Sequence, residues 1–125
     1  AQADIVVTSV TLDYSIAPFL DARDLKPNAF AAITDLCIPW MPEGLQAFKT
    51  VYVDDREQEA ESSKPMLPAE QISGDLTDLV TGTPSSHVDR PSAFAFRGIA
   101  LGDYAAAVLA VRLAEAQGAG QRITP

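Results

Sequence analysis

Three short runs of apolar residues in the first half of the chain predict buried β-strands. They occupy residues 4–10, 29–34 and 49–55. The first run is continuous and rich in β-branched side chains, which is typical of a strand buried on both faces of a sheet. Short helical links are expected between the runs, at residues 20–27 and 42–48. Strands that alternate with short helices indicate an α/β protein with a parallel sheet.

The middle of the chain is more polar and predicts less regular structure. Residues 57–68 are acidic and end at a proline, which indicates a loop or the frayed end of a helix. Residues 69–82 place apolar side chains at helical spacing, with Gly82 as the expected C-cap. Residues 83–92 are rich in Ser and Pro and predict an exposed loop.

The last part of the chain, residues 96–120, predicts a long Ala-rich helix that ends at Gly118 and Gly120. Its surface is apolar nearly all round, interrupted only by Asp103, Arg112, Glu115 and Gln117. A helix of this kind needs to be covered on more than one side. Three strands and a few short helices are too little to cover it, so we expect the chain to self-associate.

Composition and charge limit the classes of partner. With 125 residues and 13.3 kDa, the chain is long enough for one domain, residues 1–125. A net charge of −8 argues against nucleic acid and anionic membrane as partners. Single Cys37 and His87 residues argue against disulfides and zinc sites within the chain, so no metal is expected. No apolar run of about 18 residues occurs, which predicts a soluble, cytoplasmic protein.

The ends of the predicted strands are the candidates for a site, because ligands bind beyond the carboxyl ends of open parallel sheets. Thr8, Ser9 and Thr11 end the first run and offer hydroxyl groups, although a simple turn would use the same residues. Asp35 ends the second run, where it either caps a turn or places an acid at the mouth of the sheet. Residues 36–38 do not resemble the start of a helix, which favours the acid at the mouth.

Asp54 and Asp55 end the third run, and adjacent acids in this position usually include the N-cap of a helix. His87 lies in the Ser/Pro-rich loop with no partner motif, which indicates a surface residue. Neither a phosphate-binding G-x-G-x-x-G motif nor a nucleophile motif such as G-x-S-x-G occurs. Asp35 is therefore the leading catalytic candidate, and the pair Asp54-Asp55 is the alternative.

The order of these motifs resembles that of the ornithine cyclodeaminase and mu-crystallin family. ADIVVTSVT at residues 3–11 is similar to the family's ADIVVT-x-T, and LKP at 25–27 with Asp35 is similar to LKPGAH-x-x-x-x-G-x-D. VDDREQ at 53–58 is similar to V-V-D-S-R-E-Q. GDLTDLVTG and FRGIALGDYAAAVLA look like the family's AELGELLAG and F-x-S-x-G-x-A-x-x-D-x-A-A-A. The matches are colinear over nearly the whole chain.

The resemblance implies the second half of a Rossmann domain that binds NAD or NADP, in a homo-oligomer that acts on a small amino acid or imine. In the cyclodeaminases, the aspartate that matches Asp35 lies beside the nicotinamide and handles the proton of the attacking water or amine. Ketimine reductases often lack an acid there, so Asp35 favours deaminase-like chemistry. The implied cofactor contacts are Thr8, Ser9, Val10, Thr11, Ile33 and Gly98.

Two segments depart from the family pattern. CIPWMPEGL at residues 37–45 replaces PGK-x-EL, and Ala95-Phe96 stands where K-S is common. The family's glycine fingerprint, dimerisation domain and substrate-binding Lys and Arg would lie upstream of Ala1. The chain alone is therefore expected to be inactive and to bind NAD(P)H weakly. The alternatives are a non-enzymatic remnant that acts as a small self-associating binding protein, and an unrelated acidic α/β domain.

Overall fold

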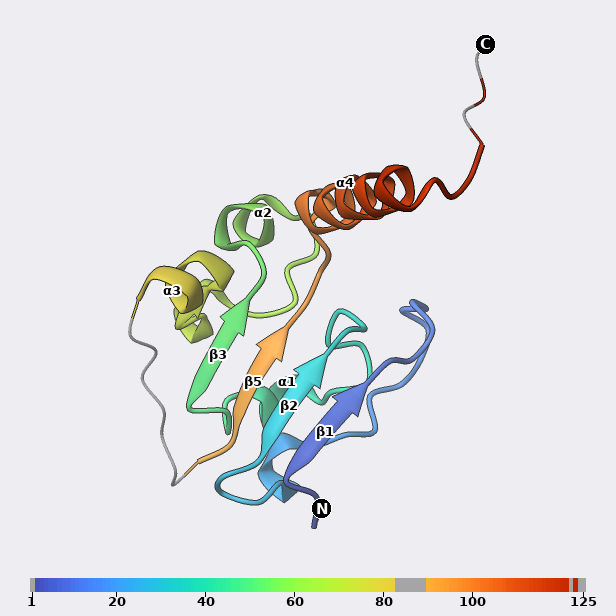
Figure 1. Cartoon of the computed structure of the whole chain (residues 1–125). Coiled ribbons are helices and arrows are strands. Elements are labelled where there is room, and N and C mark those ends of the chain that lie inside the picture. Colours follow the sequence, from blue (N-terminus) through green and yellow to red (C-terminus); the bar gives the residue numbers. More distant parts are fainter. Residues whose placement is uncertain (1, 83–89, 122, 124–125) are drawn as a thin grey trace.

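Five parallel strands form the sheet of this chain (Figure 1), in a computed structural model that describes residues 2–82, 90–121 and 123. The strands are β1 (Ile5–Thr8), β2 (Phe30–Ile33), β3 (Thr50–Val53), β4 (Gly74–Asp75) and β5 (Ser92–Ala95). Their order across the sheet is β1-β2-β5-β3-β4. The predicted fold class is confirmed: the protein is α/β, with a partial Rossmann-like sheet and a C-terminal helix.

The helices are short except for the last. They are α1 (Pro42–Leu45), α2 (Arg56–Glu61), α3 (Leu76–Thr81) and α4 (Ala100–Gln117), with single 3-10 turns η1 (Ala22–Asp24) and η2 (Ala69–Gln71). Pro42 opens α1, as its fixed φ angle favours, and Asp21 caps η1 through the backbone N–H of Arg23. Both predicted links are thus helical, but each is only about one turn long.

Two strands differ from the sequence prediction. β5 begins at Ser92, the last residue of the predicted loop 83–92, of which residues 83–89 lie outside the described part of the chain. It pairs with both β2 and β3 and occupies the middle of the sheet. β4 interrupts the helix predicted at residues 69–82. Gly74 in β4 lies against Tyr52, whose ring would be 2.6 Å from a Cβ atom at that position. A helix cannot continue through Gly74 because its backbone pairs with β3.

The two faces of the sheet are covered very differently. One face carries Ala31, Ile33, Val51 and Val53, which are buried in the core with residues such as Trp40. This core is filled by η1, by the segment that follows β2, by α1 and by residues 66–67.

The opposite face is open along β1 and β2, and Figure 1 views it with α1 behind the strands. Ile5 and Val7 are each 66% exposed, and Phe30 is 39% exposed. The prediction that the first strand is buried on both faces is therefore wrong. The covering elements named above pack on one face only, although the β1 sequence is apolar enough for both.

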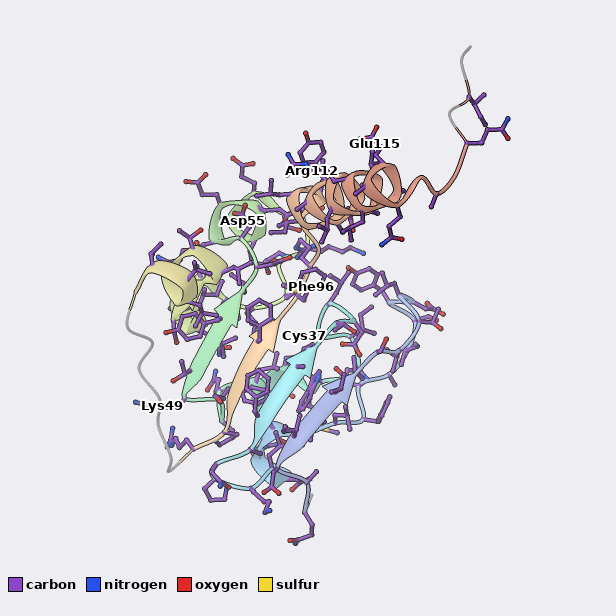
Figure 2. All side chains as sticks on the ribbon, in the orientation of Figure 1. Cys37, Lys49, Asp55, Phe96, Arg112 and Glu115 are labelled. Carbon is purple, nitrogen blue, oxygen red and sulfur yellow. The ribbon has the colours of Figure 1, made fainter. Side chains whose placement is uncertain are left out.

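Helix α4 projects beyond the carboxyl ends of the strands (Figure 1), and none of its residues is buried. Its side chains extend into solvent around the helix, with Arg112 and Glu115 on the side away from the sheet (Figure 2). The helix ends at Gly118, whose φ angle of +62° is the left-handed conformation expected of a C-cap glycine. Among the described residues, no helix is long and apolar enough to cross a membrane.

Candidate functional site

The carboxyl ends of β1 and β2 bring Asp35 against the end of the first strand. The Thr8 hydroxyl donates to Asp35 Oδ1 at 3.1 Å, and the Val10 backbone N–H donates to Asp35 Oδ2 at 3.2 Å. The indole N–H of Trp40 donates in turn to the Thr8 hydroxyl at 3.3 Å. Asp35 has 0% of its surface exposed, so its carboxylate lies inside the fold with both oxygens occupied.

The turn after Asp35 has an unusual backbone. Leu36 and Cys37 have φ angles of +57° and +59°, a region that costs a side chain steric strain. The Ile38 N–H donates to the Asp35 carbonyl at 3.1 Å and closes the turn. Residues 36–38 form no helix, in agreement with the sequence interpretation, and the carboxylate of Asp35 accepts from β1 and not from this turn.

The other implied cofactor residues are spread along the same edge. Ser9 and Thr11 are exposed beyond β1, while Ile33 is 1% exposed and belongs to the core. Gly98 follows β5 and donates its N–H to Asp54, not to Asp35. The structure thus brings Thr8, Val10 and Asp35 into contact, and it places Gly98 in a second cluster.

A cavity of about 630 Å³ lies against the turn that follows Asp35, and its walls include Leu36, Cys37 and Trp40. Asp35 itself is not among the residues that line it. Burial, followed by the charge of the nearby Asp35, raises the pKa of the Cys37 thiol to about 12. The thiol is therefore neutral at ordinary pH and is not a nucleophile.

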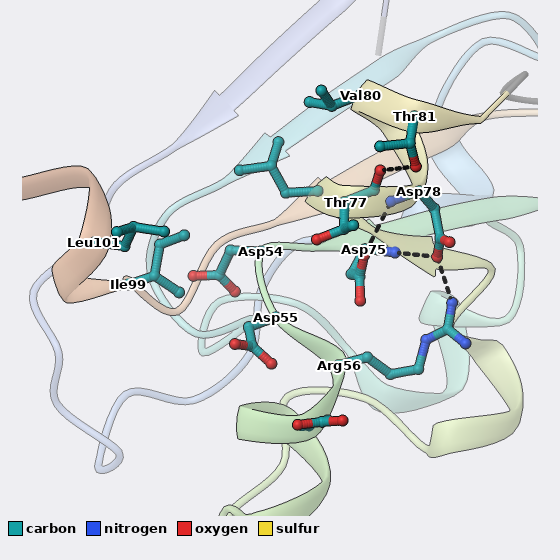
Figure 3. A pocket seen from close by; sticks show the side chains of 12 residues that line it. Asp54, Asp55, Arg56, Asp75, Thr77, Asp78, Val80, Thr81, Ile99 and Leu101 are labelled. Carbon is teal, nitrogen blue, oxygen red and sulfur yellow. Dashed lines mark hydrogen bonds and ion pairs between the residues drawn. The ribbon is translucent and has the colours of Figure 1, made fainter. Parts of the chain in front are cut away.

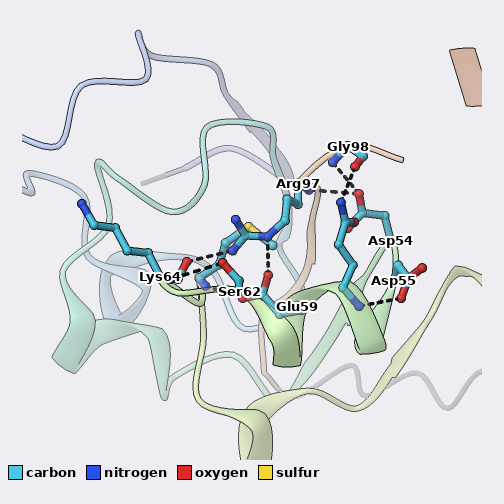
Figure 4. Close-up of polar contacts among 9 residues, drawn as sticks. Asp54, Asp55, Glu59, Ser62, Lys64, Arg97 and Gly98 are labelled. Atoms are coloured by element: carbon cyan, nitrogen blue, oxygen red, sulfur yellow. Dashed lines mark hydrogen bonds and ion pairs between the residues drawn. The ribbon is translucent and has the colours of Figure 1, made fainter. Parts of the chain in front are cut away.

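Asp54, part of the alternative acid pair in the sequence analysis, is the centre of the second cluster (Figure 4), whose contacts with Arg97 and Gly98 were not predicted. It is 4% exposed, and its Oδ2 accepts from the backbone N–H groups of Arg97 at 3.1 Å and Gly98 at 2.5 Å. No hydrogen-bond donor among the described residues reaches its other oxygen, Oδ1. Gly98 has a φ angle of +112°, which favours glycine at this close approach.

An ion pair between the buried Glu59 and the partly buried Arg97 supports this cluster. Arg97 Nε donates to Glu59 Oε2 at 2.7 Å, and a second nitrogen donates to the Lys64 carbonyl at 2.9 Å. Glu59 is 1% exposed and also accepts from the Met66 backbone N–H. The sequence gives no local sign of this pair because its members are far apart along the chain. The only available signal is that Glu59 lies on the buried side of α2. Recognising this from the sequence requires knowing at which residue the helix begins.

Asp55 has the role that its position predicts, because it caps α2 by accepting from the Gln58 N–H at 2.9 Å. His87 lies outside the described residues. Within residues 2–82, 90–121 and 123, no group of three acidic, His or Cys side chains could hold a metal ion.

Comparison with known proteins does not assign this chain to a family. Neither a scan against protein-family models nor a search of curated proteins found a match.

Proposed function

We propose that this chain is the C-terminal segment of an NAD(P)-dependent enzyme similar to the ornithine cyclodeaminases, with an amino acid or a cyclic imine as its substrate. The observation that carries the proposal is the position of Asp35. It is a fully buried acid just beyond β2, fixed by Thr8 and Val10 at the edge where parallel sheets bind ligands. The colinear motifs described above supply the class of reaction.

The chemistry assigned to Asp35 is electrostatic. Oxidation of an amine gives an iminium cation, and a fixed carboxylate nearby stabilises that charge. The same carboxylate then acts as general base towards the attacking water or amine. Bound NAD or NADP would supply the hydride acceptor. Thr8 and Val10 hold the carboxylate in place, while Ser9 and Thr11 offer exposed polar groups beside it.

The turn at Leu36 and Cys37 supports a functional role for this region. Two consecutive non-glycine residues with positive φ angles are costly, and such strain is concentrated at functional sites. In this chain, the strain directly follows the buried acid.

The described residues could bind only part of an NAD or NADP molecule. The first helical element after β1 is the single turn η1, so the described residues offer no helix N-terminus near β1 for the pyrophosphate. We therefore expect the chain by itself to bind NADH and NADPH weakly and to turn over no amino acid. Calorimetry that gave low-micromolar binding would contradict this expectation and indicate a self-sufficient domain.

The test uses the open reading frame that contains this chain, expressed with whatever coding sequence lies directly upstream. If an upstream glycine-rich βαβ unit completes an enzyme, Asp35→Asn should lower its turnover about 10²- to 10⁴-fold. The affinity for NAD(H) should not change, because the nicotinamide ring needs no anion. Full activity in that variant would make Asp35 structural.

A non-enzymatic role in self-association is the second candidate, and the apolar surfaces favour it. Ile5, Val7 and Phe30 leave one side of the sheet open, and α4 presents apolar side chains such as Leu101 and Leu109 to solvent. Large exposed apolar surfaces usually mark interfaces. Sedimentation at micromolar concentration should show an oligomer, and a stable monomer would count against self-association.

A further inference from the structure

A cavity of about 660 Å³ lies beyond the carboxyl end of β3, between the first turns of α2, α3 and α4 (Figure 3). We propose that it binds an organic cation, an ammonium or guanidinium group carried on a short apolar chain. The inference does not depend on the proposed function, since the cavity lies with the Asp54 cluster and not with Asp35. Its volume is in the range of small-molecule sites, about 300–1,000 Å³.

Asp54 provides the first argument for a cationic ligand. It lines the cavity, where Figure 3 shows its carboxylate between Ile99 and Asp55. Two backbone N–H groups already occupy Oδ2, whereas no donor of the described residues reaches the buried Oδ1. A buried carboxylate oxygen without a partner costs free energy, which a ligand N–H would recover.

The remaining charges of the lining provide the second argument. The other acids are Asp55, Glu57, Asp75 and Asp78, and Arg56 is the one basic residue in the lining. The Arg56 guanidinium is already paired with Asp78 at 2.6 Å. The cavity therefore carries an excess of negative charge, which attracts a cation and repels phosphate or carboxylate groups.

Two of the three helix N-termini at the cavity are already capped by acids of the chain. Asp55 accepts from the first turn of α2, and Asp75 accepts from the Asp78 N–H in the first turn of α3. Helix α4 begins after Ile99 without a side-chain cap, but the partial charge of one helix N-terminus, about +0.5, is smaller than the negative charge of the lining acids. No three of the described acids converge closely enough to hold a metal ion, so a bare metal is not the favoured ligand.

The apolar part of the lining defines the rest of the ligand. Leu101 and Val80 are 71% and 78% exposed, and Ile99 and Leu76 also border the cavity. These side chains come from α3, from α4 and from the residue that precedes α4, and they border a space that a purely polar ligand would fill poorly. An alkyl chain attached to the cationic group would cover them, and burial of each CH₂ group contributes about 0.8 kcal/mol.

The experiment compares three probes of equal chain length: n-hexylammonium, the neutral 1-hexanol and the anionic hexanoate. Binding to the 125-residue chain is followed by calorimetry and by amide chemical shifts. We expect n-hexylammonium to bind most tightly, with shifts at Arg97, Gly98 and Leu76, and hexanoate not to bind. Equal affinity for the three probes, shifts confined to other parts of the chain, or no binding of n-hexylammonium at millimolar concentration would each overturn the proposal.

Two variants test the site itself. Asp54→Asn keeps an acceptor for the N–H groups of Arg97 and Gly98 but presents an amide donor in place of Oδ1, so affinity for n-hexylammonium should fall about tenfold or more. Leu101→Lys introduces an ammonium at an exposed position where unfolding is not expected, and it should abolish binding. The matched control is Asp103→Asn, which removes a carboxylate from α4 outside the lining. Equal affinity in wild type and Leu101→Lys would overturn the proposal even if Asp54→Asn failed to fold.

Discussion

Two buried aspartates lie at the same edge of the sheet, and they differ in how their oxygens are used. The two carboxylate oxygens of Asp35 accept hydrogen bonds from the Thr8 hydroxyl and the Val10 backbone N–H, at the end of β1. Asp54 directs two backbone N–H groups to one oxygen and leaves the other without a donor among the described residues. Two equally buried acids can therefore differ in how firmly the fold holds them. Both oxygens of Asp35 are fixed by the chain, whereas Asp54 keeps one oxygen available for a ligand donor.

The largest expected effect concerns the support of the Asp54 cluster. Arg97→Met leaves the Glu59 carboxylate buried without its ion-pair partner, which should cost about 3–5 kcal/mol in the free energy of unfolding. Urea denaturation measures it. The double variant Glu59→Leu/Arg97→Met should lose less than Arg97→Met alone, because no uncompensated charge remains. A double variant as unstable as the sum of its single changes would contradict the ion-pair argument.

The second prediction concerns the surroundings of Asp35 at high pH. The pKa of Cys37 is raised from an ordinary value of 9.0 to about 12. Above pH 9 the unfolded thiol loses its proton while the folded thiol keeps it, so the unfolded state is favoured as pH rises. The stability present below pH 9 should fall by about 1.4 kcal/mol per pH unit between about pH 9 and 12.

The control for that prediction is Cys37→Ala, which has no thiol to titrate. Its free energy of unfolding, measured in urea at several pH values from 8 to about 11, should fall less steeply than that of the wild type. Parallel curves for the two proteins would show that the thiol is not the group responsible.

The third prediction compares the two aspartates directly. Asp35→Asn replaces one of two occupied oxygens with an NH₂ group that cannot accept, so we expect a loss of about 1–3 kcal/mol. Asp54→Asn can turn its amide NH₂ towards the position of Oδ1 and should lose less than about 1 kcal/mol. Thermal or urea unfolding of both variants decides it. Equal losses would remove the distinction drawn between them.

The smallest expected effect on stability belongs to Asp55, the neighbour of Asp54 that caps α2. Asp55→Ala removes the acceptor for the Gln58 N–H and should cost about 1 kcal/mol. Asp55→Asn caps nearly as well and should be close to neutral in the same unfolding assay. A large loss in Asp55→Asn would indicate that its charge has a further role.

The apolar runs were sufficient to predict β1, β2 and β3 and the position of Asp35 beyond β2. They were not sufficient for β5, because SAFA is short and follows a Ser/Pro-rich stretch, and its strand character comes from pairing with β2 and β3. The apolar sequence of β1 also suggested two buried faces. Which face is covered depends on where the connections run, and the pattern of one strand does not contain that information.

The sequence predicted only part of the candidate site, because the remaining part depends on β5. Thr8 and Asp35 end adjacent strands, so general sheet geometry predicts that they are neighbours. Asp54 was interpreted with Asp55 as part of a helix cap, and the pair was the alternative catalytic candidate. Its partners Arg97 and Gly98 follow β5, a strand that the sequence did not predict. The ion pair Glu59–Arg97 depends on the same strand.

The place of β5 in the sheet has a consequence for how the chain is made. β5 lies between β2 and β3 but is synthesised after both, so β1-β2 and β3-β4 cannot join until residue 95 has left the ribosome. At about 5–20 residues per second, β1 waits several seconds for the strand that completes the sheet. A nascent chain stalled before residue 95 should remain sensitive to protease along its whole length, and one released after β5 should become resistant in a single step.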